Sequence, residues 1–281
     1  MVFVFDSFNL IKPKPIKMKL KMLTGLVVTA TILSCSQSPK VDSMAGVYKM
    51  EKQLMNDGVK DYTFLASEGN TQFKIYTPES YFYIAVGKDS SVSFGTGSYT
   101  LTDGKVEEQN VFNSGSLDTA NTALLEISNK TDKGYTQYID ALEVRGTKYK
   151  LTEDYSSLEA KGTSPLDGVW HQIKNLEITG TDTVDATYNE YKVFHAGHFM
   201  WAARGLVDSV KNTYKNYVGH GTFTLVDNAL TENLDMSSMA GITGRYDISI
   251  TFNGTDEYTQ KTSDTTKSKV VGFKTYKRIS K

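Results

Sequence analysis

Hydrophobic and polar residues alternate along most of the chain in short runs. In the segment from Gln72 to Tyr76, Phe73 and Ile75 share one side of an extended backbone, whereas Gln72 and Lys74 share the other. Such runs recur about every ten residues and are separated by turn signals: Asn56-Asp57-Gly58, Asp103-Gly104, Asp227-Asn228 and Asn253-Gly254. This two-residue period predicts β-strands joined as an antiparallel meander, and no long helical period is present.

The second half of the chain repeats the first at an offset of about 120 residues. Matching blocks follow the same order: Gly46-Val47-Tyr48 with Gly168-Val169-Trp170, Phe73 to Tyr76 with Tyr191 to Phe194, Tyr81 to Tyr83 with Phe199 to Trp201, Gly95 to Leu101 with Gly219 to Leu225, Glu126 to Ser128 with Asp247 to Ser249, and Tyr135 to Gln137 with Tyr258 to Gln260. Because closure removes exposed edges from a meander of about eight strands, we expect an all-β protein of two tandem, small, antiparallel up-and-down β-barrels.

The N-terminal segment has a different pattern. A stretch with several lysines precedes an apolar run from Met22 to Leu33, which is the order found in a secretory signal. The apolar run has about twelve residues, whereas a spanning helix needs roughly twenty. It ends in Ile32-Leu33-Ser34-Cys35, which resembles the lipobox of bacterial lipoproteins.

The lipobox resemblance implies cleavage before Cys35, a covalent lipid on its thiol, and a membrane as partner through that anchor. Acyl chains contribute roughly 0.8 kcal/mol per buried methylene, so two or three of them hold a chain on a bilayer. Ser36, rather than Asp, follows the cysteine, which by resemblance to lipoprotein sorting implies the outer membrane, on its periplasmic or surface-facing side.

These patterns divide the chain into successive segments. We predict a signal peptide at 1–34, a tether at 35–43, a first barrel at 44–155, a linker at 156–165 and a second barrel at 166–281. The linker consists largely of small or polar residues and contains Gly162 and Pro165.

Composition narrows the possible functions. Lys plus Arg number 31 against 32 Asp plus Glu, so no basic excess favours a nucleic-acid partner. The abundance of Tyr (17) and Phe (13) suits pleated, half-buried strands. The single cysteine excludes an internal disulfide framework and Cys-rich metal sites.

The start of each repeat resembles a known family. Gly168-Val169-Trp170 is similar to the Gly-x-Trp motif of lipocalins, and Gly46-Val47-Tyr48 departs from it by having tyrosine. Later blocks resemble the small lipocalin-like domains of secreted bacterial lipoproteins. The resemblance covers most of both repeats and implies barrels that hold a small apolar or amphipathic molecule, without naming that molecule.

Aromatic residues are the candidate ligand-binding residues. They either line a cavity or form a packed barrel core, and they are Tyr48, Tyr81, Tyr83, Trp170, Phe199 and Trp201. In contrast, Glu107, Glu108 and Glu232 are expected to be solvated strand residues.

All four histidines, His171, His195, His198 and His220, lie in the second repeat. Imidazoles ligate metals or act as general bases, so His171, His198 and His220 are candidate metal ligands. Surface or hydrogen-bonded histidines at strand ends are the alternative. His195 and His198 converge only if Ala196-Gly197 forms a turn, because residues three apart on a strand face opposite sides.

Three functions therefore remain open. The first is a membrane-tethered, extracytoplasmic protein that binds a small apolar or amphipathic ligand. The second is a structural or protein-interaction module of the cell envelope, and the third is a histidine-based metal protein or enzyme in the second barrel. The sequence contains no zincin motif, phosphate loop or nucleophile elbow, so it offers an enzyme no direct support, and it names no cofactor besides the lipid.

Overall fold

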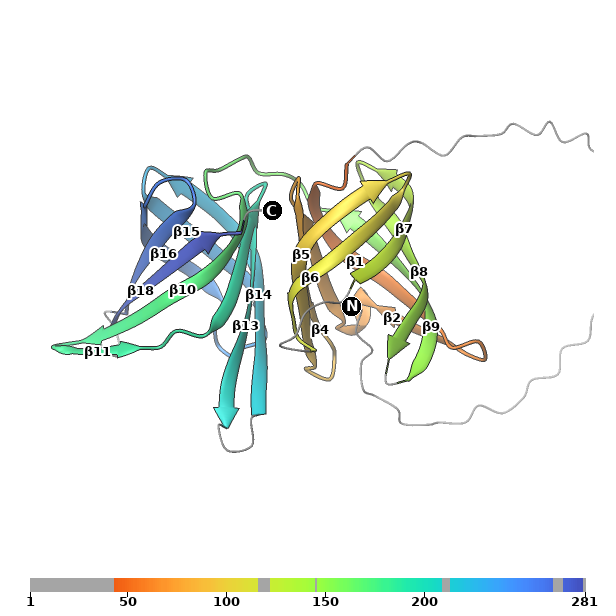
Figure 1. Ribbon diagram of the computed structural model, residues 1–281, viewed down its shortest axis with the longest axis horizontal. Helices are drawn as coiled ribbons and strands as arrows, with labels where there is room; N and C mark the ends of the chain where they lie inside the picture. The colour runs from red at the N-terminus through yellow and green to blue at the C-terminus, as the bar shows by residue number, and fades with distance from the viewer. Residues whose placement is uncertain (1–42, 116–121, 145, 209–212, 265–269, 280–281) are drawn as a thin grey trace, which may run out of the picture.

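The computed structural model describes residues 43–115, 122–144, 146–208, 213–264 and 270–279, which form two antiparallel β-barrels (Figure 1). The first barrel contains β1 (Gly46–Asn56), β2 (Asp61–Leu65), the short 3-10 helix η1 (Ala66–Glu68), β3 (Thr71–Tyr76), β4 (Ser80–Val86), β5 (Val92–Thr102), β6 (Lys105–Asn113), β7 (Thr122–Thr131), β8 (Gly134–Val144) and β9 (Thr147–Ser157). The second contains β10 (Gly168–Thr179), β11 (Asp182–Asp185), β12 (Asn189–His195), β13 (His198–Asp208), β14 (Thr213–Val226), β15 (Ala229–Ser237), β16 (Gly244–Phe252), β17 (Glu257–Asp264) and β18 (Val270–Arg278).

Both barrels are closed rings. In each nine-stranded sheet, β1 and β3 to β9, or β10 and β12 to β18, pair in chain order, and the ring closes by pairing β1 with β9 and β10 with β18. The strands β2 and β11 lie outside the rings, because each pairs only with the far half of the strand before it. The prediction of two tandem antiparallel barrels is therefore confirmed. Within the described ranges, no helix is long and apolar enough to cross a bilayer.

The two copies share their strand irregularities as well as their strand order. A register shift between Met50 and Lys52 in β1 recurs between Gln172 and Lys174 in β10. A second shift, beside Gly97 in β5, recurs beside Gly221 in β14. At that bulge a Cβ would lie 1.8 Å from the Gln109 carbonyl oxygen in the first copy and 2.0 Å from the corresponding oxygen in the second. Only glycine fits so close to a neighbouring backbone.

One block of the sequence alignment is out of register. The alignment matched Glu126-Ile127-Ser128 with Asp247-Ile248-Ser249. In the structure, Leu125 pairs with Val106, and Ile248 pairs with the equivalent Leu230. Leu125 is thus the counterpart of Ile248, and the correct alignment differs by two residues. A shift of two keeps every side chain on its own face, so the alternation alone does not reveal it.

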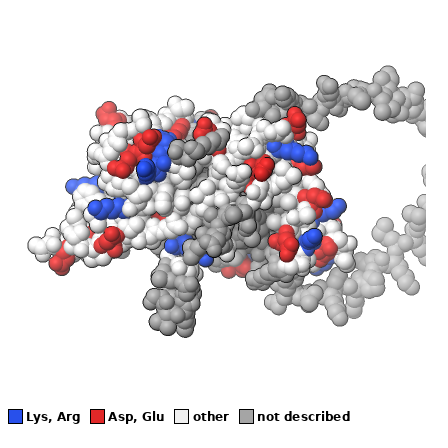
Figure 2. Space-filling view, viewed as in Figure 1, with Lys and Arg blue, Asp and Glu red and all other residues white. Residues whose placement is uncertain are grey.

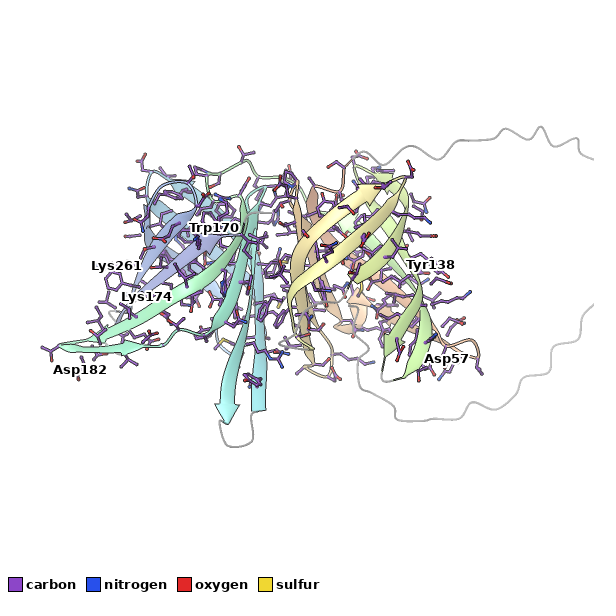
Figure 3. The ribbon with its side chains drawn as sticks, viewed as in Figure 1. Asp57, Tyr138, Trp170, Lys174, Asp182 and Lys261 are labelled. Atoms are coloured by element: carbon purple, nitrogen blue, oxygen red, sulfur yellow. The ribbon has the colours of Figure 1, made fainter. Side chains whose placement is uncertain are left out.

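The chain enters each barrel at the same end, and that end is closed. The Tyr48 hydroxyl donates to the Met44 carbonyl at 3.0 Å, and the Trp170 indole N–H donates to the Leu166 carbonyl at 2.7 Å. Both aromatic rings are buried among apolar side chains. The hairpin tips near Asp57 and Asp182 lie at the opposite end of their barrels (Figure 3).

The outer faces of the two barrels pack against each other. The interface is a continuous apolar cluster built mainly from β3, β4 and β5 of the first barrel and their counterparts β12, β13 and β14. Within it Phe112 stacks on Tyr191, with ring centroids 4.6 Å apart, and Phe73 stacks on His220 at 3.8 Å. Strands on this side are consequently buried on both faces. Elsewhere, the visible surface carries acidic and basic side chains intermixed (Figure 2).

Candidate functional site

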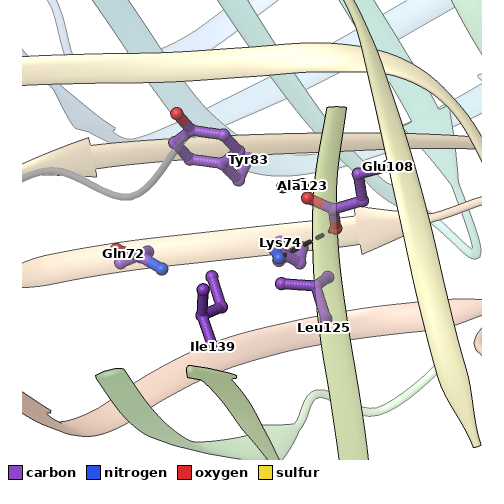
Figure 4. A pocket seen from close by; sticks show the side chains of 7 residues that line it. All are labelled: Gln72, Lys74, Tyr83, Glu108, Ala123, Leu125 and Ile139. Atoms are coloured by element: carbon purple, nitrogen blue, oxygen red, sulfur yellow. Dashed lines mark hydrogen bonds and ion pairs between the residues drawn. The ribbon is translucent and has the colours of Figure 1, made fainter. Parts of the chain in front are cut away.

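The interior of the first barrel is filled. A void of about 10 Å³ lies among its side chains, which is room for about one water molecule. Figure 4 shows the side chains around it: Gln72, Lys74, Tyr83, Glu108, Ala123, Leu125 and Ile139. Among the described residues, buried aromatic and aliphatic side chains pack the rest of this lumen.

A buried polar network occupies the centre of this filled barrel. The Lys74 ammonium lies 3.0 Å from a Glu108 oxygen and also donates to Gln137 at 3.2 Å. The Glu153 carboxylate accepts from Gln53 at 2.6 Å and from the Tyr155 hydroxyl at 2.9 Å. Each of the three charged groups thus has hydrogen-bond partners inside the barrel, as buried charges require.

The second barrel is hollow. A cavity of about 1170 Å³ extends from the middle of its lumen to the hairpin end, at or above the roughly 300–1,000 Å³ typical of small-molecule sites. The residues along β12 show how deep the cavity extends into the barrel. Phe194 is part of the apolar cluster at the closed end, Lys192 and Glu190 line the cavity above it, and Tyr188, just before the strand, is 39% exposed.

At three equivalent positions the two barrels have different residues, and these help to explain why one lumen is filled and the other is hollow. In the first barrel Leu151 pairs with Ile139 on one side and Met55 on the other, and all three side chains are buried. The second barrel has the equivalent trio Gly272, Thr262 and Glu177, and each of these residues borders the cavity. Smaller or charged side chains there leave the lumen unfilled.

The outer hairpin strand adds to this difference. Tyr62 and Phe64 on β2 pack partly buried against the core of the first barrel. The counterpart β11 has the sequence Asp182-Thr183-Val184-Asp185, and all four residues are exposed. The hairpin of the second barrel therefore contributes no aromatic side chain to close the mouth.

The cavity has two chemically different walls. One wall, called here the polar wall, comes from β10, β12, β17 and β18 and presents Asn175, Glu190, Lys192, Gln260 and Lys274. The apolar wall comes from β13 to β16 and presents Phe199, Trp201, Tyr217, Leu234 and Ile248, with Glu232 on β15 as its charged residue. A cavity lined this way matches an amphipathic molecule.

Two ion pairs lie within the cavity. Lys192 and Glu232 approach to 2.5 Å, and Lys274 and Glu190 approach to 3.0 Å. Burial opposes ionisation of Glu190, but the Lys274 ammonium and a hydrogen bond from Tyr276 outweigh it and lower the pKa of the carboxyl. Burial likewise disfavours the Lys274 ammonium, yet Glu190 raises the pKa of that lysine above its ordinary value. Both members of this pair are therefore charged at neutral pH.

The structure distributes the predicted aromatic residues over different environments. Phe199 and Trp201 line the cavity of the second barrel. Tyr48, Tyr81 and Trp170 belong to packed cores, and Tyr83 borders the small void of the first barrel. The prediction did not separate these groups, because the repeats place aromatic residues at equivalent positions whether or not the lumen is filled.

The four histidines lie on or near the interface rather than in the cavity. Ala196 and Gly197 form a tight turn with positive φ, so His195 and His198 pair directly across β12 and β13. His198 and His220 are stacked with centroids 5.8 Å apart, whereas His171 stacks on Tyr191. The structure thus does not bring His171 together with His198 and His220, and among the described residues no group of three or more His, Cys, Asp or Glu is placed to hold a metal.

The charged residues of the lumen were missed or misassigned from sequence. Glu108 and Glu232 were expected to be solvated, but their exposed fractions are 2% and 7%, and each is paired with a lysine. Glu107 is exposed, as expected. The available signal was the alternation itself, because Glu190 and Lys192 share a strand face with the apolar Phe194.

Comparisons with known proteins give only distant structural likenesses. No protein-family model and no curated protein sequence matches the chain. A candidate outer membrane protein from Bacteroides fragilis is similar over 84% of this chain and 97% of its own, with 13% identity and a TM-score of 0.27. A DUF3598-family protein of unknown function from Nostoc punctiforme is similar over 84% of this chain and 96% of its own, with 9% identity and a TM-score of 0.25.

Transferrin binding protein B from Haemophilus parasuis is similar over 80% of this chain and 56% of its own, with 13% identity and a TM-score of 0.26. Likenesses at this level give no information about the function of the chain.

Proposed function

We propose that this chain is an exported lipoprotein whose second barrel binds a small amphipathic molecule. The cavity of about 1170 Å³ carries the proposal, because the equivalent lumen of the first barrel is filled. Phe199 and Trp201 would contact the apolar part of the ligand. The polar wall would contact the remainder.

Binding can be tested with an uncharged apolar fluorophore, N-phenyl-1-naphthylamine, and the mature full-length protein. Gly205 borders the cavity, and a Cβ there would lie 3.8 Å from the nearest Tyr217 carbon, so a side chain can be added without a backbone clash. We expect Gly205→Phe to narrow the cavity and weaken binding at least about tenfold, equal to about 1.4 kcal/mol. Val226→Phe, at the end of the neighbouring strand β14 and at a 68% exposed position, is the control. Equal binding by both variants would refute the proposal.

The anchor rests on the lipobox resemblance, since Cys35 lies outside the described residues. Labelled palmitate should enter the wild-type protein, and Cys35→Ala should lose both the label and the membrane fractionation. Outer-membrane placement is tested by the density at which the labelled protein sediments with separated membranes. If the wild-type protein does not incorporate labelled palmitate, the anchor proposal is refuted, and the ligand proposal is unaffected.

A further inference from the structure

Resting on the proposed ligand site, we propose that its ligand is an amphipath without net charge, whose polar groups are hydroxyls. Four charged residues line the lumen below the mouth, and they are called here the inner charged set: Glu190, Lys192, Glu232 and Lys274. Their formal charges sum to zero. Among the described lining residues the one further carboxylate is Glu177, which is exposed at the mouth, where solvent screens it.

The inner charged set is already paired within itself. The Lys192 and Glu232 side chains are 5% and 9% exposed at a separation of 2.5 Å. Lys274 and Glu190 are 26% and 6% exposed at 3.0 Å, and the Tyr276 hydroxyl also donates to Glu190. Neither pair leaves a whole charge unmatched.

A charged ligand would disturb this balance. A ligand carboxylate in the lumen must either lie near Glu190 and Glu232 or draw a lysine away from its partner. In both cases one carboxylate remains unmatched in a poorly solvated site, and an unpaired buried charge is strongly destabilising. A ligand ammonium meets the same obstacle with the sign reversed.

Hydrogen-bonding capacity nevertheless remains on the polar wall. The Gln260 side-chain oxygen is buried and has no hydrogen-bond partner among the described residues. Lys274 is the most accessible member of the inner charged set, and its ammonium has three donors. A hydroxyl group can donate to the Gln260 oxygen and accept from Lys274, whereas an ion satisfies only one of them. The facing apolar wall accommodates a hydrocarbon body.

Three probes with the same ten-carbon chain separate charge from chain length: decane-1,2-diol, decanoate and decylammonium. Each competes against N-phenyl-1-naphthylamine at concentrations below micelle formation. We expect the diol to bind about tenfold more tightly than either ion, equal to about 1.4 kcal/mol. The inference is overturned if a charged probe binds as tightly as the diol, or if the diol does not displace the bound fluorophore. Either result leaves the proposed function standing. Absence of fluorophore binding removes the proposed function itself.

Charge variants test the stated cause. Lys274→Met gives the inner charged set one net negative charge and should shift preference about tenfold toward decylammonium, whereas Glu190→Gln should shift it equally toward decanoate. The double variant restores neutrality and should restore preference for the diol, even if the single variants fold poorly. Lys277→Met removes an exposed charge from the same strand and should change nothing. Unchanged preferences in the folded single variants would overturn the inference.

Discussion

The stacked pair of Phe73 and His220 makes the interface between the barrels sensitive to acid. His220 is 4% exposed, and neither of its ring nitrogens has a hydrogen-bond partner among the described residues. Burial, followed by the nearby His198 and Lys161, lowers the pKa of His220 to about 3. In the unfolded chain the pKa returns to about 6.5.

The direction of the effect follows from proton binding. Between pH 6.5 and pH 3 the unfolded chain binds a proton that the folded protein excludes, so stability falls as the pH falls through this window. Above pH 6.5 both states are neutral and the contribution is constant. At about 1.36 kcal/mol per pH unit, His220 alone should reduce the free energy of unfolding by about 2 kcal/mol at pH 5 relative to pH 8.

Urea unfolding at pH 8 and pH 5, followed by tryptophan fluorescence, measures this difference. His220→Phe keeps an aromatic ring against Phe73 but cannot ionise, so it should lose about 2 kcal/mol less than the wild type on acidification. Contributions from the other histidines occur in both proteins and cancel. The reasoning is refuted if both proteins lose the same stability, or if NMR titration of the His220 ring gives a pKa near 6.5.

Two further predictions concern the barrel interiors. Lys74→Met leaves Glu108 buried without its cation and should reduce the free energy of unfolding by about 3–5 kcal/mol in urea titrations; Lys192→Met should have a smaller effect, because its partner borders the open cavity. Gly221→Ala places a Cβ 2.0 Å from a backbone oxygen and should destabilise the fold by more than about 2 kcal/mol, whereas Gly205→Ala should change stability by less than about 1 kcal/mol. Equal effects within either pair would contradict the packing described for it.

The fold could be predicted from sequence because strands and their repeat leave strong local patterns. Alternation between Gln72 and Tyr76 identified two strand faces, and the duplicated blocks identified two copies of one ring. The alternation did not show which of the two strand faces points into the barrel. Phe73 and Ile75 point outward into the interface, and Lys74 points into the lumen. A second barrel covering the outer face reverses the usual rule that the apolar face is the inner one.

The cavity could not be predicted, because it depends on pairing across strands. Leu151 and Gly272 are equivalent only once the register of β9 and β18 is known, and these strands carry no matched sequence block. Trp170 and Trp201 look alike as aromatic strand residues, yet only Trp201 borders the cavity. The histidines of the second copy suggested a metal or catalytic site, but His198 and His220 lie at the interface and beside it.

The strands β13 and β14 have one face in the cavity and the other against the first barrel. Trp201 and Ala203 face the lumen, whereas Met200 and Ala202, which alternate with them along β13, belong to the interface cluster. Expansion of the lumen around a guest must therefore displace residues that the neighbouring barrel holds in place. If the proposed ligand expands the lumen in this way, its affinity and barrel association are linked, and each alters the other by the same free energy. Hydrogen exchange in β3 to β5 that is unchanged by a bound guest would show that the two are independent.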